Sequence, residues 1–105
     1  MNECAAIYKA LGDPIRLEIV KRLAATKSST VGELSANLGI SRQGARKQLQ
    51  VLVDANVVNL RPQGRKTEVM LETKTLSTAR AFIGELERQW DARLNALKQF
   101  VEQSE

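Results

Sequence analysis

Apolar residues spaced three or four positions apart predict two short helices at the start of the chain. The first covers residues 3–11 and ends before Gly12. Asp13 and Pro14 then supply an N-cap and a proline at the first helical position, so a second helix begins there. The first helix has one apolar face, formed by Ala6, Ile7, Ala10 and Leu11. The apolar stripe of the second helix should face a core, and it consists of Ile15, Ile19, Val20 and Leu23.

The segment that follows has the pattern of a helix-turn-helix. Thr30 and Glu33 have the spacing of a capping box, which predicts a short helix that ends at Gly39. Ser41 then caps a second helix over residues 41–55. Two short helices joined by a three- or four-residue turn with a glycine make this motif. The inward-facing residues of its first helix are Val31, Leu34 and Leu38.

Beyond Asn56 the pattern changes to that of a hairpin. Val57, Val58 and Leu60 favour a strand, residues 62–65 are turn-forming, and residues 67–71 return as a second strand. The hairpin, about residues 57–72, must pack on the helices because an isolated one is marginally stable. The sequence therefore predicts a mainly α fold with a small β-hairpin, in a single domain over residues 1–105.

A long helix without proline is predicted for residues 75–103. It carries one continuous apolar face, longer than a small domain needs for its own core. We expect this face to pack against the same helix of a second copy, although a helix lying flat on its own domain is the alternative. The apolar positions are Leu76, Ala79, Ile83, Leu86, Trp90, Leu94, Leu97 and Val101.

The helix over residues 41–55 has two chemically different faces. Ala45, Leu49 and Leu52 should pack inward, and a second set should lie on the opposite side. Arginine suits the edge of guanine and glutamine that of adenine, so this set matches base recognition in DNA. Its members are Gln43, Arg46, Lys47 and Gln50. Gly44 leaves the helix start without an acid, either to admit a phosphate or to allow close packing.

The positive charge of the chain is concentrated in one segment. The formal net charge is +4, and residues 42–66 hold six basic residues against one acid, Asp54. A basic patch on a nearly neutral body indicates a polyanionic partner, although a solvated surface is the alternative. In the hairpin, the basic side chains could contact phosphates or only protect an exposed strand edge. They are Arg61, Arg65 and Lys66.

Other classes of function have little support in the sequence. The chain has no histidine and no phosphate-binding glycine loop, so no enzyme is indicated. No apolar run approaches the roughly 18 residues of a membrane span, and the N-terminus lacks the pattern of a signal peptide. We therefore expect a cytoplasmic protein without membrane contact. Cys4 is the single cysteine, expected to be a buried apolar residue, with redox sensing across a dimer as the alternative.

RNA binding and a dimeric protein-interaction module remain alternatives to DNA binding. No aromatic residue lies inside the basic segment, which disfavours stacking on unpaired bases. The intact basic face of residues 42–47 disfavours a pure interaction module. The aromatic residues are Tyr8, Phe82, Trp90 and Phe100.

Three stretches of the chain resemble the ArsR/SmtB family of winged helix-turn-helix repressors, over residues 9–72. They are LGDPIRLEIVKRL, VGELSANLGISRQGARKQLQVLVDANVV and LRPQGRKTEVML. The resemblance implies that residues 41–55 enter the major groove and that residues 63–66 contact the backbone or minor groove. It also implies a homodimer held by the flanking helices. Many members release DNA when a metal binds.

The metal-sensing part of this resemblance is missing. Metal-sensing relatives carry a Cys-x-Cys pair where this chain has Thr30 and Gly32, and others use histidines on the last helix. We therefore expect neither a metal site nor a cofactor, and the inducer is unknown. The expected DNA-binding residues are Ser41, Arg42, Gln43, Arg46, Lys47, Gln50, Arg61, Arg65 and Lys66. The expected dimer-interface residues are Ile7, Leu86, Trp90, Leu94, Leu97 and Val101.

Overall fold

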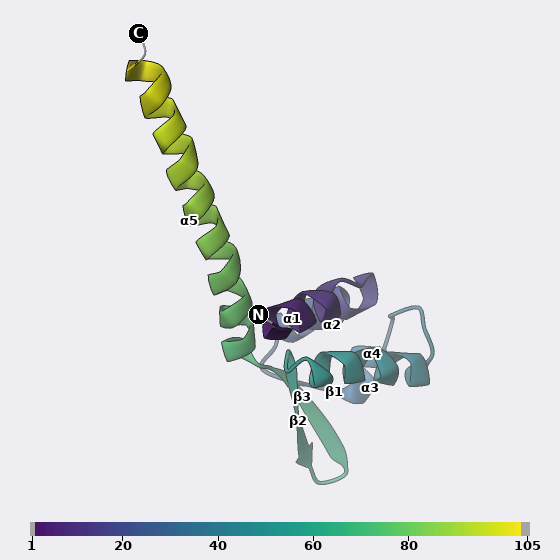
Figure 1. Cartoon of the computed structure of the whole chain (residues 1–105). Helices are drawn as coiled ribbons and strands as arrows, with labels where there is room; N and C mark the ends of the chain where they lie inside the picture. Colours follow the sequence, from purple (N-terminus) through teal and green to yellow (C-terminus); the bar gives the residue numbers. More distant parts are fainter. Residues whose placement is uncertain (1, 104–105) are drawn as a thin grey trace.

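The computed structural model describes residues 2–103 of the chain. The helices in this range are α1 (Asn2–Leu11), α2 (Pro14–Ala24), α3 (Val31–Ser35), α4 (Arg42–Asp54) and α5 (Thr73–Gln103). The strands are β1 (Ser29–Thr30), β2 (Val58–Gln63) and β3 (Lys66–Leu71). Figure 1 shows that α1 to α4 and the sheet form a body from which α5 projects. The expected mainly α fold with a hairpin is confirmed.

Side chains cap three helices at the predicted positions. The Asp13 carboxylate accepts hydrogen bonds from the backbone N–H groups of Ile15 and Arg16, at 2.9 and 3.1 Å. Thr30 and Glu33 form the reciprocal capping box. Ser41 Oγ accepts a hydrogen bond from the backbone N–H of Gly44 at 3.0 Å. Each cap satisfies N–H groups that have no partner within the helix, which fixes where the helix begins.

The turn between α3 and α4 is longer than predicted. α3 ends at Ser35 and not at Gly39, so residues 36–41 connect the two helices. The guanidinium of Arg22 on α2 donates to carbonyls that a further helical turn would otherwise satisfy. These carbonyls belong to Leu34, Ala36 and Asn37. Asn37 (φ 60°) and Gly39 (φ 75°) then adopt left-handed conformations that redirect the chain towards α4.

Strands β2 and β3 form the predicted hairpin, which we call the wing. Their antiparallel register runs from Val58 opposite Leu71 to Gln63 opposite Lys66. The sequence does not predict β1, because two residues are too few to show an alternating pattern. β1 pairs with the other side of β3 and leads directly into α3. The sheet therefore ties the wing to the first helix of the helix-turn-helix.

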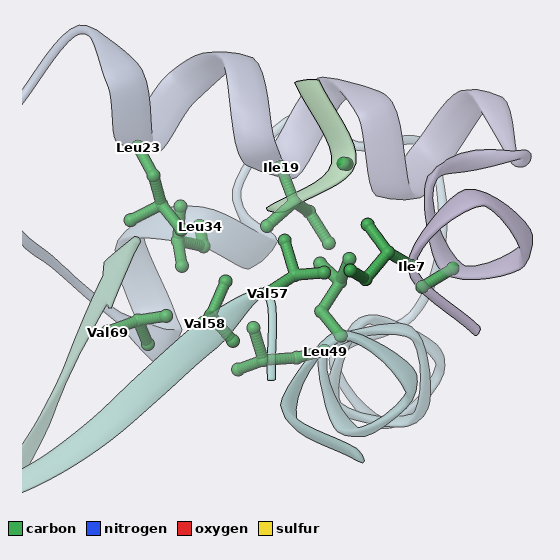
Figure 2. Close-up of a cluster of buried hydrophobic side chains, with 11 residues drawn as sticks. Ile7, Ile19, Leu23, Leu34, Leu49, Val57, Val58 and Val69 are labelled. Atoms are coloured by element: carbon green, nitrogen blue, oxygen red, sulfur yellow. The ribbon is translucent and has the colours of Figure 1, made fainter. Parts of the chain in front are cut away.

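The hydrophobic core lies between α1, α2, α4 and the base of the wing. Figure 2 shows apolar side chains from these elements directed into one shared space. Three residues of α4 contribute to this region, Ala45, Leu49 and Leu52, and each is at most 5% exposed. Their burial holds one face of α4 against the body and leaves the other face outward. The most completely buried side chains are Ile19, Leu23, Leu52, Val57, Val58 and Val69.

Helix α5 is attached to the body only through its first turns. It begins at Thr73, two residues earlier than predicted. The Tyr8 hydroxyl of α1 donates to the backbone carbonyl of Ala79 at 2.6 Å, and the rings of Tyr8 and Phe82 lie 6.1 Å apart. From Glu85 to its last residue, every residue of α5 is exposed. The described chain is consequently elongated, with extents of 71 × 25 × 25 Å.

Candidate nucleic-acid interface

The exposed face of α4 carries the side chains that the sequence singles out. Arg42, Gln43, Arg46, Lys47 and Gln50 are all exposed, in contrast to the buried face of the same helix. No acidic residue lies in its first turn. The N-terminus of a helix carries partial positive charge, so these basic side chains add to a region that already attracts anions.

A groove of about 490 Å³ separates α4 from the wing. Arg46 and Gln50 line it from the helix, and Arg65 and Lys66 line it from the tip of the wing. The structure thus brings the basic side chain of Arg46 to the same groove as Arg65 and Lys66, which lie about twenty positions later in the sequence. The other residues that line the groove are Thr30, Val31, Gly32, Leu49, Val53, Leu60 and Thr67.

Gln50 and Arg61, two of the expected DNA-binding residues, have acidic neighbours on their own helix or on the paired strand. The side-chain amide of Gln50 donates to the Asp54 carboxylate at 2.8 Å. Gln50 must give up this hydrogen bond before its amide can contact a base. Arg61 pairs in register with Glu68 on β3, which partly offsets its charge. These neighbours make Gln50 and Arg61 weaker candidates for DNA contacts than Arg46.

Gly44 lies close to its own helix start and not to another helix. A Cβ added there would lie 3.2 Å from Ser41 Oγ and 3.7 Å from the Ile40 side chain. A side chain at this position would therefore crowd the N-cap. The expectation of close packing against a neighbouring helix is not what the structure shows. Gly44 leaves room for the cap and keeps the helix start uncovered.

The exposed half of α5 forms a second surface, which we call the α5 face. It is strongly apolar: Trp90 is 62% exposed and Leu97 is 60% exposed. Phe100, which the three- and four-residue spacing did not select, is 70% exposed. A continuous row of exposed large apolar side chains marks an interaction surface. Its large apolar residues are Ile83, Leu86, Trp90, Leu94, Leu97, Phe100 and Val101.

Ile7 does not belong to an exposed surface, contrary to its expected place in a dimer interface. Its side chain is 3% exposed and lies in the hydrophobic core. An apolar stripe on a short helix such as α1 can pack on its own domain, which explains why Ile7 lies in the core. Cys4, on the same helix, is half-buried. Partial burial, with a smaller contribution from Cys4, raises the pKa of Tyr8, whose protonated hydroxyl donates to Ala79.

Neither a metal-binding cluster nor a membrane-spanning helix occurs within residues 2–103. This part of the chain contains no cluster of three or more cysteine, histidine or acidic side chains that could hold a metal ion. None of its helices combines the length and apolar character needed to cross a membrane.

Comparison with known proteins gives consistent results. A helix-turn-helix domain model matches residues 11–61. The chain is 34% identical over 95 residues to the HTH-type transcriptional regulator Rv2034 of Mycobacterium tuberculosis, covering 90% of this chain and 85% of that protein. An ArsR-like transcriptional regulator from Rhodococcus sp. RHA1 superimposes with a TM-score of 0.82 at 28% identity, covering 94% of this chain and 92% of the other.

A further similar structure is a dimer. The homodimeric winged helix-turn-helix DNA-binding domain of Mb0332 from Mycobacterium bovis, a possible ArsR-family regulator, has a TM-score of 0.64 at 22% identity. The match covers 89% of this chain and 82% of that domain. At this level of identity the similarity establishes the shared fold.

Proposed function

Because this chain belongs to the ArsR family of winged helix-turn-helix transcriptional regulators, which bind DNA and are not enzymes, we propose that it is a sequence-specific repressor. It acts in the cytoplasm as a homodimer on double-stranded DNA with an inverted-repeat operator. The observation that carries this proposal is the groove that brings Arg46 of α4 together with Arg65 and Lys66 of the wing. One binding surface thereby combines a helix for base edges with a wing for the backbone.

The residues divide into two roles by position and chemistry. Arg46 and Gln43 lie near the start of α4 on its exposed face, so they are assigned to base edges in the major groove. Arg65 and Lys66 lie at the wing tip and are assigned to phosphates, together with the N-terminus at Ser41. Base contacts determine sequence preference, whereas phosphate contacts add affinity for any sequence.

Dimerisation follows from the α5 face. Two copies joined there would present two α4 helices to one duplex, which fits half-site centres roughly 10 base pairs apart. The homodimeric Mb0332 domain, which shares this fold, supports the proposal of a homodimer. A dimer that covers an operator within a promoter would exclude RNA polymerase. Transcription in vitro from a template with the selected site should therefore fall as the protein is added.

The test begins by selecting bound sequences from a random duplex pool. Arg46→Ala should weaken binding to the selected operator by about 1–3 kcal/mol per half-site and flatten the preference at one or two positions. Arg65→Ala should weaken binding to all duplexes about equally. It should also make the slope of log affinity against log salt concentration shallower by about one unit per lost phosphate contact. Both variants are measured on operator and scrambled duplex at several salt concentrations.

Single-stranded RNA of the same length serves as the competitor in these measurements. An unchanged sequence preference in Arg46→Ala would remove α4 from base recognition. RNA binding tighter than duplex binding would favour the RNA alternative, and no binding to either would favour a protein-interaction module.

We also propose that DNA binding does not respond to metal ions. The chain has no histidine, and Thr30 and Gly32 stand where the metal-sensing relatives hold cysteines. Cys4, even paired across a dimer, offers two thiolates where a structural zinc site needs four ligands. Calorimetric titration of the reduced protein with Zn²⁺, with and without operator, should show no tight binding and no loss of DNA affinity. Stoichiometric submicromolar binding that releases DNA would overturn this.

A further inference from the structure

Arg16 of α2 contacts two other helices at once. Its Nε donates to the backbone carbonyl of Ala10 at 2.6 Å, and its Nη2 donates to that of Lys9 at 3.2 Å. Both carbonyls lie in the last turn of α1, where helix carbonyls lack intrahelical partners and carry partial negative charge. Its Nη1 donates to the side-chain oxygen of Gln48 on α4 at 2.7 Å. One guanidinium thus joins the end of α1 to the middle of α4.

Gln48 lies where it can control the orientation of α4. It is half-buried, between the core-facing residues and the exposed face with Arg46 and Lys47. The core contacts of α4 are apolar and have little directional preference, so they tolerate a small rotation of the helix about its axis. A charge-assisted hydrogen bond is directional and short, so it restricts that rotation. The Arg16–Gln48 hydrogen bond therefore adds a directional restraint to the orientation that the buried face of α4 already gives the helix.

We propose that Arg16 is a positioning residue for DNA recognition, acting through Gln48 on the orientation of α4. This inference rests on the proposed function. The same guanidinium holds the end of α1, and α1 is joined to α5 through the hydrogen bond from Tyr8 to Ala79. Figure 1 shows α1 lying against the base of α5. The orientation of α4 is thereby linked to the helix that carries the proposed dimer interface.

The test uses Gln48→Met and Arg16→Lys in the full chain. Methionine keeps the length and helix propensity of glutamine but removes the acceptor. Lysine keeps the positive charge near the α1 carbonyls, but its single ammonium cannot reproduce the planar fork. Each variant should lower the ratio of operator to scrambled-duplex affinity about tenfold, as expected for the loss of one charge-assisted hydrogen bond. Scrambled-duplex affinity and its salt dependence should stay unchanged.

The double variant separates positioning from a general structural effect. If the two side chains act through one hydrogen bond, Arg16→Lys with Gln48→Met should be no worse than either single change. Additive losses, or an unchanged ratio in Gln48→Met, would overturn the proposal. Arg80→Lys on α5 is the matched control and should leave the ratio unchanged. If Arg16→Lys does not fold, Gln48→Met alone decides. A wild-type protein without operator preference would instead contradict the proposed function.

Discussion

Glu33 shows how one side chain combines a local and a long-range role. The Glu33 carboxylate accepts a hydrogen bond from the backbone N–H of Thr30 at 2.9 Å, and the backbone N–H of Glu33 donates to Thr30 Oγ1 at 3.1 Å. Hydrogen bonds to this carboxylate from the backbone and the side chain of Thr30 lower the pKa of Glu33 against the opposing effect of burial, and Lys66 at the wing tip adds a smaller lowering. The ionised carboxylate therefore stabilises the folded state.

Glu33→Gln should lower the melting temperature at pH 7, because glutamine can accept the hydrogen bond but carries no charge. A carboxyl pKa that is lower in the folded state stabilises the protein above the unfolded pKa of about 4.3. That contribution disappears as the pH falls through the lower folded pKa. Thermal unfolding of both proteins between pH 7 and pH 3 should thus show a gap that closes in acid.

Glu102→Gln, on an exposed part of α5, is the control for loss of one negative charge. A gap between wild type and Glu33→Gln that persists unchanged at pH 3 would show that the charge of Glu33 is not involved.

The residue scale also shows which contacts a sequence can predict. The caps at Asp13, Thr30 and Ser41 bridge two or three positions, so local spacing reveals them. The contacts of Arg16 and Arg22 bridge up to 32 positions and depend on how α2 packs. Both arginines occur on a helix whose apolar stripe fixes only the face towards the core. Nothing local indicates which carbonyls or amides lie opposite the other face.

At the scale of elements, the wing depends on the turn at its tip. Gln63 and Lys66 pair in register, which leaves a two-residue loop of Gly64 and Arg65. Gly64 has φ +62°, a left-handed conformation that glycine adopts without steric cost. A glycine at the first loop position is typical of the tight turns whose twist matches a hairpin. This turn positions Arg65 and Lys66 for the phosphate contacts proposed above.

Gly64→Ala should destabilise the wing by about 1–2 kcal/mol, because an alanine resists the left-handed conformation. Nothing lies within 4 Å of the added Cβ, so the cost is conformational and not a clash. Duplex affinity should fall for operator and scrambled DNA alike, without a change in sequence preference. Equilibrium binding to both duplexes checks this, together with thermal unfolding.

Gly84→Ala within α5 is the matched control and should not weaken DNA binding. A selective loss of operator affinity in Gly64→Ala would show that the wing takes part in base recognition.

The elements differ in how far the sequence predicts them. Long periodic segments such as α5 are predicted almost to the residue, because many positions repeat the same signal. The end of α3 at Ser35 is missed because Gly39 suggests a later end, and the contacts of Arg22 with the carbonyls there join distant positions. β1 is missed because its pairing with β3 joins residues about forty positions apart.

At the scale of the whole molecule, shape separates two functions. The radius of gyration is 19.1 Å, whereas a compact chain of about 100 residues has one of about 13 Å. The excess comes from α5, whose 31 residues extend about 46 Å. The groove between α4 and the wing lies on the body, and α5 projects away from this body (Figure 1). The proposed dimer interface and the proposed DNA-binding surface are therefore separate.

Replacing both Leu94 and Leu97 with glutamate should convert the dimer into a monomer, because burying unpaired charge at an interface is strongly unfavourable. Operator binding should then fall sharply, since the two half-sites are no longer linked. Sedimentation measures the mass. The emission of Trp90, the single tryptophan, should shift to longer wavelength as its ring becomes exposed to water.

Ala92→Glu with Asn95→Glu is the matched control, because both positions lie on the opposite side of α5 by the helical period. This control should remain dimeric. A Leu94→Glu, Leu97→Glu protein that stays dimeric with full operator affinity would place the interface elsewhere.

The exposed second half of α5 also has a consequence for gene control. A single amphipathic helix of this length gains little stability in water until another surface covers its apolar side. Assembly then depends on the square of the protomer concentration, and so does the amount of operator-competent protein while dimers are scarce. Operator occupancy would therefore be very low when little protein is expressed, and it would rise steeply as expression increases. Promoter shut-off would thus depend on how much protein is made, even without any inducer.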